Sequence, residues 1–309
     1  MGYFDQYELR HLSKLDLLAK QVVEGFIIGL HKSPFHGFSV EFAEHRLYNT
    51  GDNIKNVDWK VYARTEKLFL KKYEEETNLR CQIVIDASSS MHYPKFKAGK
   101  KLELSKFEFS ALGAASLMNL LKRQRDAFGI TLFDETISEH LRPKSSHTHY
   151  KLLLSKLEHI INNPPENKST SAADSLHKIA ESIHKRSMVI IFSDMFERTE
   201  DSSELFSALQ HLKHNKHEVV LVHVFDKTTE MDFDFPEKPH IFIDMESGAE
   251  VKVQPSEVKD QYLTQMNNFR KNLKTKCLQY KMDMVEADIK QGYNEILQAY
   301  LIKRKKMGI

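Results

Sequence analysis

The spacing of apolar and polar residues changes near residue 80 of this 309-residue chain. Beyond that point, short apolar runs bounded by polar residues alternate with longer segments in which apolar residues recur at helical spacing. The short runs are typical of strands that are buried on both faces. Strands in regular alternation with helices favour a mostly parallel sheet that is covered on both sides. The pattern therefore predicts a Rossmann-like, doubly wound α/β fold over residues 79–309.

The individual elements of this domain follow from the same periodicities. Strands are expected at residues 80–88, 126–141, 187–194, 217–226 and 282–288, the second of them broken by a turn at Asp134 and Glu135. Helices are expected at residues 101–125, 150–161, 171–186, 202–215, 256–280 and 293–306. Two short strands around Gly248 predict a β-hairpin inserted at about residues 230–255.

The first 78 residues have a different pattern. Apolar residues at helical spacing from residue 5 to about residue 30 predict an amphipathic helix, which Pro34 and Gly37 end. Aromatic and β-branched residues follow up to residue 75, interrupted by the turn-forming sequence NTGDN. We interpret residues 1–78 as a helix and β elaboration that packs on the main domain, rather than as an independently folded domain.

Composition and charge narrow the class of protein. The chain is 41% hydrophobic and 28% charged, as soluble globular proteins are, and its net charge of +2 gives no electrostatic reason to expect nucleic acid as a partner. Cys81 and Cys277 lack the close spacing of a zinc motif, and so few thiols fit a reducing cytoplasm. The apolar run VVEGFIIGL contains Glu24 and is too short to span a bilayer. We expect a cytoplasmic protein without direct membrane insertion.

Polar residues follow the predicted strands at points where ligands bind. Asp86, Ser88 and Ser90 come directly after the first strand as D-x-S-x-S, and Asp194 ends the strand SMVIIFSD. Thr170 lies in the loop before the helix that leads into that strand. The carboxyl ends of parallel strands share one edge of a sheet, and alternate residues of an extended turn point to one side. These five residues are therefore candidates for one shared site.

The donor types at this site favour a hard divalent cation. Two carboxylates with hydroxyl groups and water suit Mg²⁺ in particular, or another divalent cation such as Mn²⁺ or Ca²⁺, and they need no His or Cys, which argues against zinc. The alternative is that the Asp and Ser residues cap the following helix, which is their commoner role. Thr170 and Asp194, each in the expected order along the chain, favour the metal site.

The five residues resemble the metal-ion-dependent adhesion site of the von Willebrand factor type A family, in which D-x-S-x-S is followed by a loop threonine and a strand-end aspartate. The resemblance implies that Ser88, Ser90 and Thr170 bind the ion directly, and that the aspartates often act through water. Ser89, between the two ligating serines, is expected to tolerate change. The chain departs from the family at Met195, where many members have glycine, and we expect this to change the turn more than the coordination.

The segment before the first strand resembles the signature of a bacterial family called domain of unknown function 58. The residues that carry this match are Glu24, Gly25, Gly29, Ser33, Gly37, Glu41, Phe42, Arg46, Tyr48, Gly51, Asp52, Asp58, Trp59, Ala63, Arg64 and Glu76. The segments FIDMESGAEVKVQPSEVKDQYL and VEADIKQGYNEILQAYLIKR also resemble that family. The resemblance covers nearly the whole chain.

The N-terminal motif supplies no nucleophile with its base, which favours a structural role. Trp59, the only tryptophan, is expected to anchor this segment by packing. A buried ion-pair network is expected to clamp the segment to the sheet, and its members are Arg46, Asp52, Asp58 and Arg64. The alternative is that an arginine of the motif faces a partner. The residues assigned as structural or partner-facing are Arg46, Tyr48, Gly51, Asp52, Asp58, Trp59 and Arg64.

These observations predict a non-enzymatic, metal-dependent protein-interaction module. A cation held by the five site residues would keep a coordination position for a Glu or Asp of a partner protein. The family resemblance implies that the partner is an AAA+ ATPase of the MoxR type, with a role in protein assembly, maturation or stress response. The alternative is a metal-dependent hydrolase that uses the same ion to activate water, although the sequence fixes no general base beside the ion.

Overall fold

The computed structural model describes residues 15–31, 45–47, 59–71, 79–94, 104–165, 172–196 and 203–307. The chain divides into two compact units, one formed by residues 1–26 with 79–309 and the other by residues 27–78. The larger unit contains the predicted α/β domain. The expected packing of the N-terminal elaboration on that domain stays a prediction.

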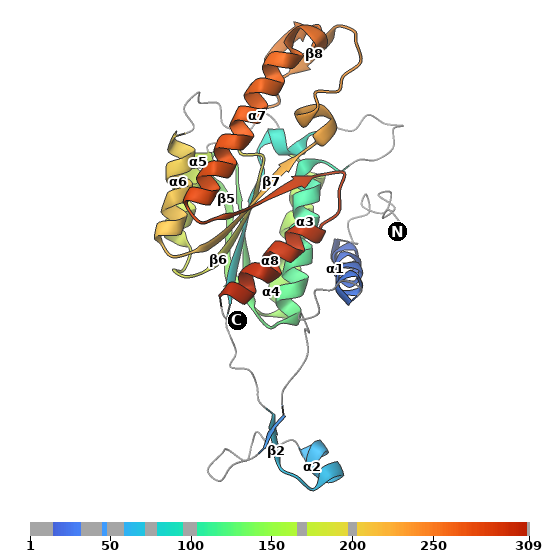
Figure 1. Ribbon diagram of the computed structural model, residues 1–309, viewed down its shortest axis with the longest axis vertical. Coiled ribbons are helices and arrows are strands. Elements are labelled where there is room, and N and C mark those ends of the chain that lie inside the picture. The colour runs from blue at the N-terminus through green and yellow to red at the C-terminus, as the bar shows by residue number, and fades with distance from the viewer. Residues whose placement is uncertain are drawn as a thin grey trace. The chain divides into compact units, whose positions relative to one another are not determined.

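A six-stranded sheet forms the centre of the larger unit (Figure 1). Its strands are β3 (Arg80–Asp86), β4 (Ala127–Phe133), β5 (Ile137–Lys144), β6 (Met188–Ser193), β7 (Glu218–Phe225) and β10 (Asp283–Asp288). They lie in the order β10-β7-β6-β3-β4-β5, and every neighbouring pair is parallel except β4 with β5. The predicted mostly parallel sheet is confirmed.

The central strands are continuous apolar runs because both faces of the sheet are covered. Ile83 of β3 lies opposite Ile130 of β4 and Ile190 of β6, and all three side chains are buried. The edge strand β5 instead has only exposed and half-buried residues, since its outer edge has no neighbouring strand in the described sheet. The hydrophobic pattern of the sequence thus distinguishes the buried central strands from the edge strand β5.

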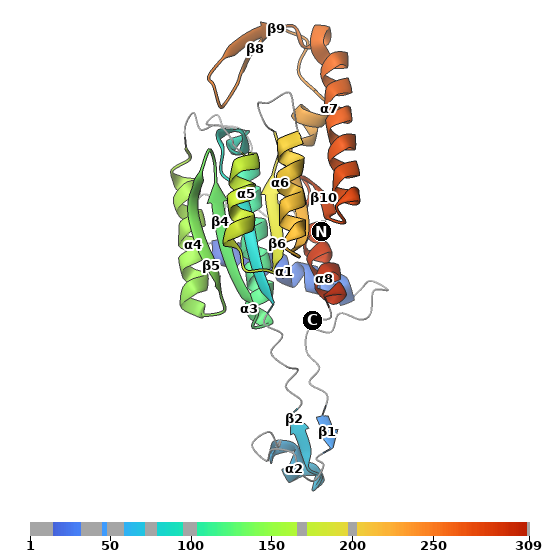
Figure 2. The same ribbon diagram turned by 90° about the vertical axis from the view of Figure 1, so that its left-hand side faces the viewer.

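Helices cover both faces of this sheet, which makes it doubly wound (Figure 2). One face carries α3 (Lys106–Arg123), α4 (His147–Asn162) and α8 (Asn294–Lys306), and the other carries α5 (Ala172–Ser182), α6 (Ser203–His214) and α7 (Pro255–Gln279). Leu176 of α5 and Leu209 of α6 share a core cluster with Val84 of β3. On the opposite face, Tyr150 of α4 packs edge-on against Phe128 of β4, with 6.0 Å between the ring centroids.

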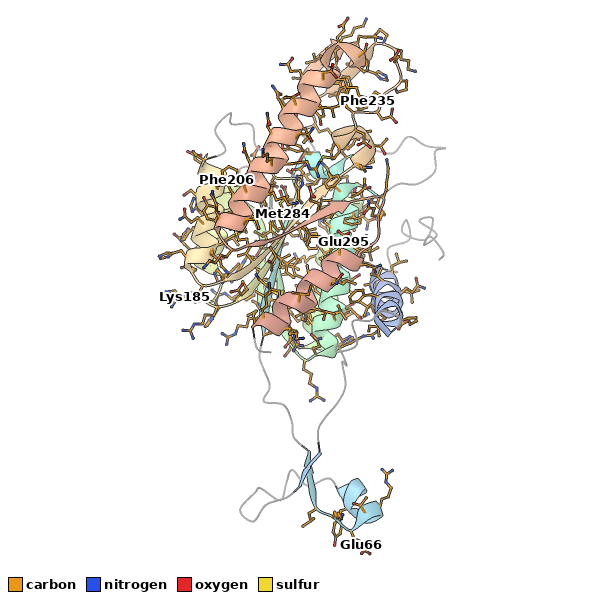
Figure 3. All side chains as sticks on the ribbon, viewed as in Figure 1. Glu66, Lys185, Phe206, Phe235, Met284 and Glu295 are labelled. Atoms are coloured by element: carbon orange, nitrogen blue, oxygen red, sulfur yellow. The ribbon has the colours of Figure 1, made fainter. Side chains whose placement is uncertain are left out.

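The predicted hairpin is confirmed as β8 (His240–Ile243) paired antiparallel with β9 (Glu250–Val253). Gly248 has a φ angle of +72° in the connecting turn, a conformation that glycine adopts without strain. Phe235, which is labelled in Figure 3, precedes the hairpin and packs against Phe242, with 5.1 Å between the ring centroids. Aromatic packing therefore fixes the chain that enters the hairpin.

The predicted N-terminal helix is α1 (Leu15–His31). Its apolar stripe is buried and consists of Leu15, Leu18, Ala19, Val22, Val23 and Phe26. The hydroxyl group of Tyr150 donates a hydrogen bond to Oδ1 of Asp16 at 2.7 Å, which ties the start of α1 to α4. Within the ranges that the structure describes, every helix is too short or too polar to cross a membrane.

Within the smaller unit, β1 (His45–Leu47) pairs antiparallel with β2 (Phe69–Lys71), and α2 (Trp59–Thr65) comes between them in sequence. Arg64 lies in α2, a helix of seven residues whose described side chains are exposed. The expected ion-pair network that would clamp this segment to the sheet stays a prediction. For two further motif residues, Arg46 and Trp59, the structure describes only the backbone, and outside its described ranges lie Tyr48, Gly51, Asp52 and Asp58.

Candidate metal-binding site at the carboxyl edge of the sheet

Strands β3 and β6 lie side by side at the centre of the sheet, and the chain leaves them in opposite directions. From β3 it continues to β4 on one side, and from β6 it continues to β7 on the other. In an open parallel sheet this reversal opens a crevice at the carboxyl ends of the two strands, where ligands bind. Ile85 of β3 lies opposite Phe192 of β6, so Asp86 and Asp194 reach the same edge.

Asp86 is fully buried at the end of β3 and joins the two loops of this edge. Its Oδ1 accepts a hydrogen bond from the backbone N–H of Ser88 at 3.0 Å, and its Oδ2 accepts one from the hydroxyl of Ser193 at 2.7 Å. Oγ of Ser193 also accepts a hydrogen bond from the backbone N–H of Met195 at 2.9 Å. The carboxylate of Asp86 therefore connects the loop after β3 to the loop after β6.

The structure brings together the hydroxyl groups of Ser88 and Ser90, whose Oγ atoms are 3.1 Å apart. Ser90 lies in a 3₁₀ turn, η3 (Ser89–His92), and Ser88 is the residue before it. Ser88 precedes this turn but makes no capping hydrogen bond with its side chain, and the next long helix, α3, is capped by Ser105. Ser88 thus does not fill the alternative role of a helix cap, and its hydroxyl lies beside that of Ser90.

Asp194 is fully buried directly after β6. Its Oδ1 accepts a hydrogen bond from the backbone N–H of Phe196 at 3.2 Å, which closes a tight turn. Within that turn Met195 has a φ angle of +57°, in the left-handed region where a side chain causes strain and glycine does not. The turn therefore has a backbone that suits glycine, the residue that the family resemblance implies at this position, while the Met195 side chain is buried in the core.

One residue that contacts Asp194 was not predicted from the sequence. Lys106, the first residue of α3, donates from Nζ to Oδ2 of Asp194 at 2.8 Å and to Oε1 of Glu230 at 2.6 Å. Glu230 lies in η4 (Lys227–Met231), a π-helical turn that follows β7. The sequence did not indicate this role, because the predicted helix begins at residue 101 whereas α3 begins at Lys106.

Burial and the charges of neighbouring groups determine the protonation of these side chains. Burial, and then the charge of Asp194, raise the pKa of Asp86 to about 6. Burial alone would lower the pKa of Lys106, but the charges of Asp194 and Glu230 raise it above its ordinary value. Burial raises the pKa of Glu230 against the opposing effect of Lys106. With the three carboxylates ionised, three negative charges and one ammonium give a formal charge of −2.

The oxygen atoms at this edge fit a hard divalent cation. Asp86, Asp194, Ser88 and Ser90 offer carboxylate and hydroxyl groups, and a formal charge of −2 is one that a divalent ion neutralises. Among the described residues, no group of three or more His, Cys, Asp or Glu side chains is arranged to hold a metal ion. The Lys106 ammonium is positively charged and cannot be a metal ligand, and it already donates a hydrogen bond to one oxygen of Asp194.

Thr170, the fifth residue of the predicted site, lies outside the described residues. The structure thus brings four of the five candidates to the edge between β3 and β6 and adds Lys106, Glu230 and Ser193 to them. Ser193 directly precedes Asp194 in the sequence, so its place at the strand end followed from the same reasoning. Glu230 had no comparable signal, because it lies in a loop far along the chain.

The chain is similar to a described protein family and to several known proteins. Residues 44–272 match the family model described as protein of unknown function DUF58. The uncharacterized protein Rv1480 of Mycobacterium tuberculosis is 22% identical over 239 residues, which cover 77% of this chain and 71% of the relative. The hypothetical protein BatB of Bacteroides thetaiotaomicron is 15% identical, with a TM-score of 0.44 over 74% of this chain and 98% of that chain.

A further solved structure to which the chain was matched is the VWA domain of SpRpn10. It is 10% identical to this chain, with a TM-score of 0.37, and the match covers 70% of this chain and 92% of that domain. The family match and the order of the strands identify the larger unit as a domain of von Willebrand factor type A-like fold, as the sequence predicted.

Proposed function

We propose that this chain, which belongs to the DUF58 family, is a protein-interaction module that binds a carboxylate of a partner through a divalent cation. The ligands of that cation would be Asp86, Ser88, Ser90, Thr170 and Asp194. The observation that carries the proposal is the 3.1 Å approach of the Ser88 and Ser90 hydroxyls at the carboxyl edge of β3. A pair of hydroxyls beside two buried carboxylates, at the usual ligand position of this fold, suits Mg²⁺.

The residues of the chain have distinct roles in this proposal. The serine hydroxyls are neutral donors, so they would hold the ion without cancelling its charge. Asp86 fixes the two loops through its bonds to Ser88 and Ser193, which keeps the donors in place before any ion binds. A bound Mg²⁺ or Mn²⁺ would supply a concentrated positive charge, and a Glu or Asp of the partner is the group that such a charge attracts.

The partner that we propose is an AAA+ ATPase of the MoxR type. This part of the proposal rests on the family resemblance of the sequence, which implies such a partner for chains of this kind. A role of the pair in assembly, maturation or stress response of other proteins follows from the same resemblance. The chemistry of the site adds one requirement, which is that the partner presents an accessible carboxylate at the contact.

Two histidines beside the site are poor candidates for the general base of a hydrolase. His92 is buried in η3 and stacks on Phe107, with 5.0 Å between the ring centroids. His223 of β7 is fully buried, its Nε2 lies 3.1 Å from the carbonyl oxygen of Asp194, and burial lowers its pKa to about 4. A catalytic base needs access to the attacking water and a pKa near the working pH. We therefore favour binding over hydrolysis.

A capture experiment with the purified ATPase tests this proposal. The full chain is immobilised and exposed to the ATPase with Mg²⁺ or with a chelator, and wild type is compared with Asp86→Ala and Asp194→Ala. Ser89→Ala is the matched control, because this residue lies between the two candidate serines. We expect wild type and Ser89→Ala to capture the ATPase when Mg²⁺ is present and not when the chelator is present. The two aspartate variants should not capture it in either condition.

Two results would contradict the proposal. Capture that ignores both the chelator and the aspartate substitutions would exclude a metal bridge. Turnover of a phosphodiester or peptide substrate that disappears in Asp86→Ala would assign the site to a hydrolase. Circular dichroism of each variant establishes that a loss of capture does not come from unfolding.

A further inference from the structure

Lys106 is connected to the candidate site through both its side chain and its backbone. Its Nζ bonds to Asp194 and Glu230, and the side chain is 1% exposed. The backbone N–H of Lys106 donates a hydrogen bond to the carbonyl oxygen of Tyr93 at 2.9 Å. The backbone N–H of Tyr93 in turn donates one to the carbonyl oxygen of Ser90 at 3.2 Å. Lys106 is therefore attached to the loop of the candidate ligands through its backbone and to their carboxylates through its side chain.

Glu230 makes two further hydrogen bonds that hold it in position. Its Oε2 accepts a hydrogen bond from the backbone N–H of Asp226 at 2.7 Å, and its carbonyl oxygen accepts one from the hydroxyl of Tyr262 at 3.0 Å. The Lys106 ammonium also lies 5.8 Å from the centre of the Phe196 ring, within the range of a cation–π interaction. These contacts form a receptor for one positive charge inside the domain.

Asp194 belongs both to this receptor and to the candidate metal site. Its Oδ1 accepts from the N–H of Phe196 and its Oδ2 accepts from Lys106, so both oxygens are engaged. A divalent ion that uses Asp194, directly or through a water molecule, has to share a carboxylate with an ammonium. Two positive groups at one buried carboxylate repel each other strongly, because little water screens them.

We propose that Lys106 is an internal cation of this site, and that it competes with the divalent metal for Asp194. Tight metal binding then requires the Lys106 ammonium to move away from Asp194. The ammonium can remain bonded to Glu230 when it does so. The inference rests on the proposed function, since it concerns the same ligands. As a consequence, the metal affinity of the chain alone is moderate. A partner carboxylate raises this affinity because it completes the coordination of the ion.

The double substitution Lys106→Met with Glu230→Gln tests this competition at constant charge. Wild type has three carboxylates and one ammonium, and the double variant has two carboxylates, so both sites have a formal charge of −2. Replacement of Glu230 together with Lys106 limits the uncompensated charge to Asp194, which is the one carboxylate that still loses its ammonium partner. Mn²⁺ affinity is measured by isothermal titration calorimetry on the full chain, with Ser88→Ala added to the double variant to verify the location of the ion.

We expect the double variant to bind Mn²⁺ about tenfold or more tightly than wild type, and the added Ser88→Ala to reverse this gain. The single variant Glu230→Gln keeps the ammonium and loses a negative charge, so it should bind Mn²⁺ more weakly than wild type. Equal or weaker binding by the double variant would overturn the competition and leave the metal site intact. Absence of Mn²⁺ binding in both proteins would overturn the competition together with the proposed metal site.

Discussion

The Nζ atom of Lys106 lies 2.8 Å from Oδ2 of Asp194, and each of these side chains is 1% exposed. The pair joins the first residue of α3 to the residue that follows β6, so it links two loops of the carboxyl edge. Glu230 receives the same ammonium at 2.6 Å. Removal of the shared cation would leave the buried carboxylate of Asp194 and the half-buried carboxylate of Glu230 without this charge partner, which gives the first prediction.

Substitution of Lys106→Met is expected to lower the free energy of unfolding by about 3–5 kcal/mol, because it leaves uncompensated buried charges. The double variant with Glu230→Gln should lose less, since one of those charges is removed as well. Urea denaturation measures both effects. Lys151→Met is the control, because that lysine is 57% exposed beside Asp16 and should change stability by less than about 1 kcal/mol. A small effect of Lys106→Met would show that the pair does not stabilise the fold.

At Met195 two substitutions separate backbone strain from packing. Both Met195→Ala and Met195→Gly remove a buried side chain from the core, but only glycine relieves the left-handed φ angle of +57°. The glycine variant is therefore expected to be about 1 kcal/mol more stable than the alanine variant. Thermal or urea unfolding of the two variants gives the difference, and an alanine variant that is the more stable of the two would refute the strained turn.

Asp126, in the loop between α3 and β4, predicts a pH dependence of stability. Burial raises its pKa from 3.8 to about 7, against the opposing charge of Arg304 at 3.2 Å. A folded-state pKa above the unfolded value contributes stability that is complete below about pH 4 and is lost as the pH rises through about 7. Between pH 5 and 8, wild type should lose about 1–2 kcal/mol relative to Asp126→Asn. Parallel pH profiles of the two proteins would disprove this assignment.

Gly129 of β4 faces the carbonyl oxygen of Leu141 across an irregularity in the pairing with β5. A Cβ atom at this position would lie 2.3 Å from that oxygen and 2.8 Å from the backbone nitrogen of Pro143. Neither contact can relax through a flexible side chain, so Gly129→Ala should cost about 3 kcal/mol of stability. Gly292→Ala is the control, because a Cβ there meets nothing within 4 Å. Similar unfolding midpoints for the two variants would contradict the close approach.

The fold could be predicted from the sequence because the strands have a simple signal. A strand such as β6, with all six residues buried, is a continuous apolar run between polar residues. The edge that gathers Asp86 and Asp194 followed from the general rule that parallel strands present their carboxyl ends together. Both inferences use local patterns and one rule of topology, and neither requires the position of a particular side chain.

The contact of Lys106 with Glu230 could not be predicted in this way. The two residues are 124 positions apart, and the π-helical turn that presents Glu230 has no periodic pattern. The left-handed backbone of Met195 was equally hidden, since methionine gives no sign of a positive φ angle. Such features depend on how loops from different strands pack together, which tertiary structure alone determines.

The central claim is that the hydroxyls of Ser88 and Ser90 bind a divalent cation at the edge between β3 and β6. Calorimetric titration of the full chain with Mn²⁺ tests it on wild type, on the double variant Ser88→Ala with Ser90→Ala, and on Ser89→Ala. We predict that wild type and Ser89→Ala bind a single Mn²⁺ with similar affinity, and that the double variant binds it at least about tenfold more weakly. Equal affinity of wild type and the double variant would contradict the claim.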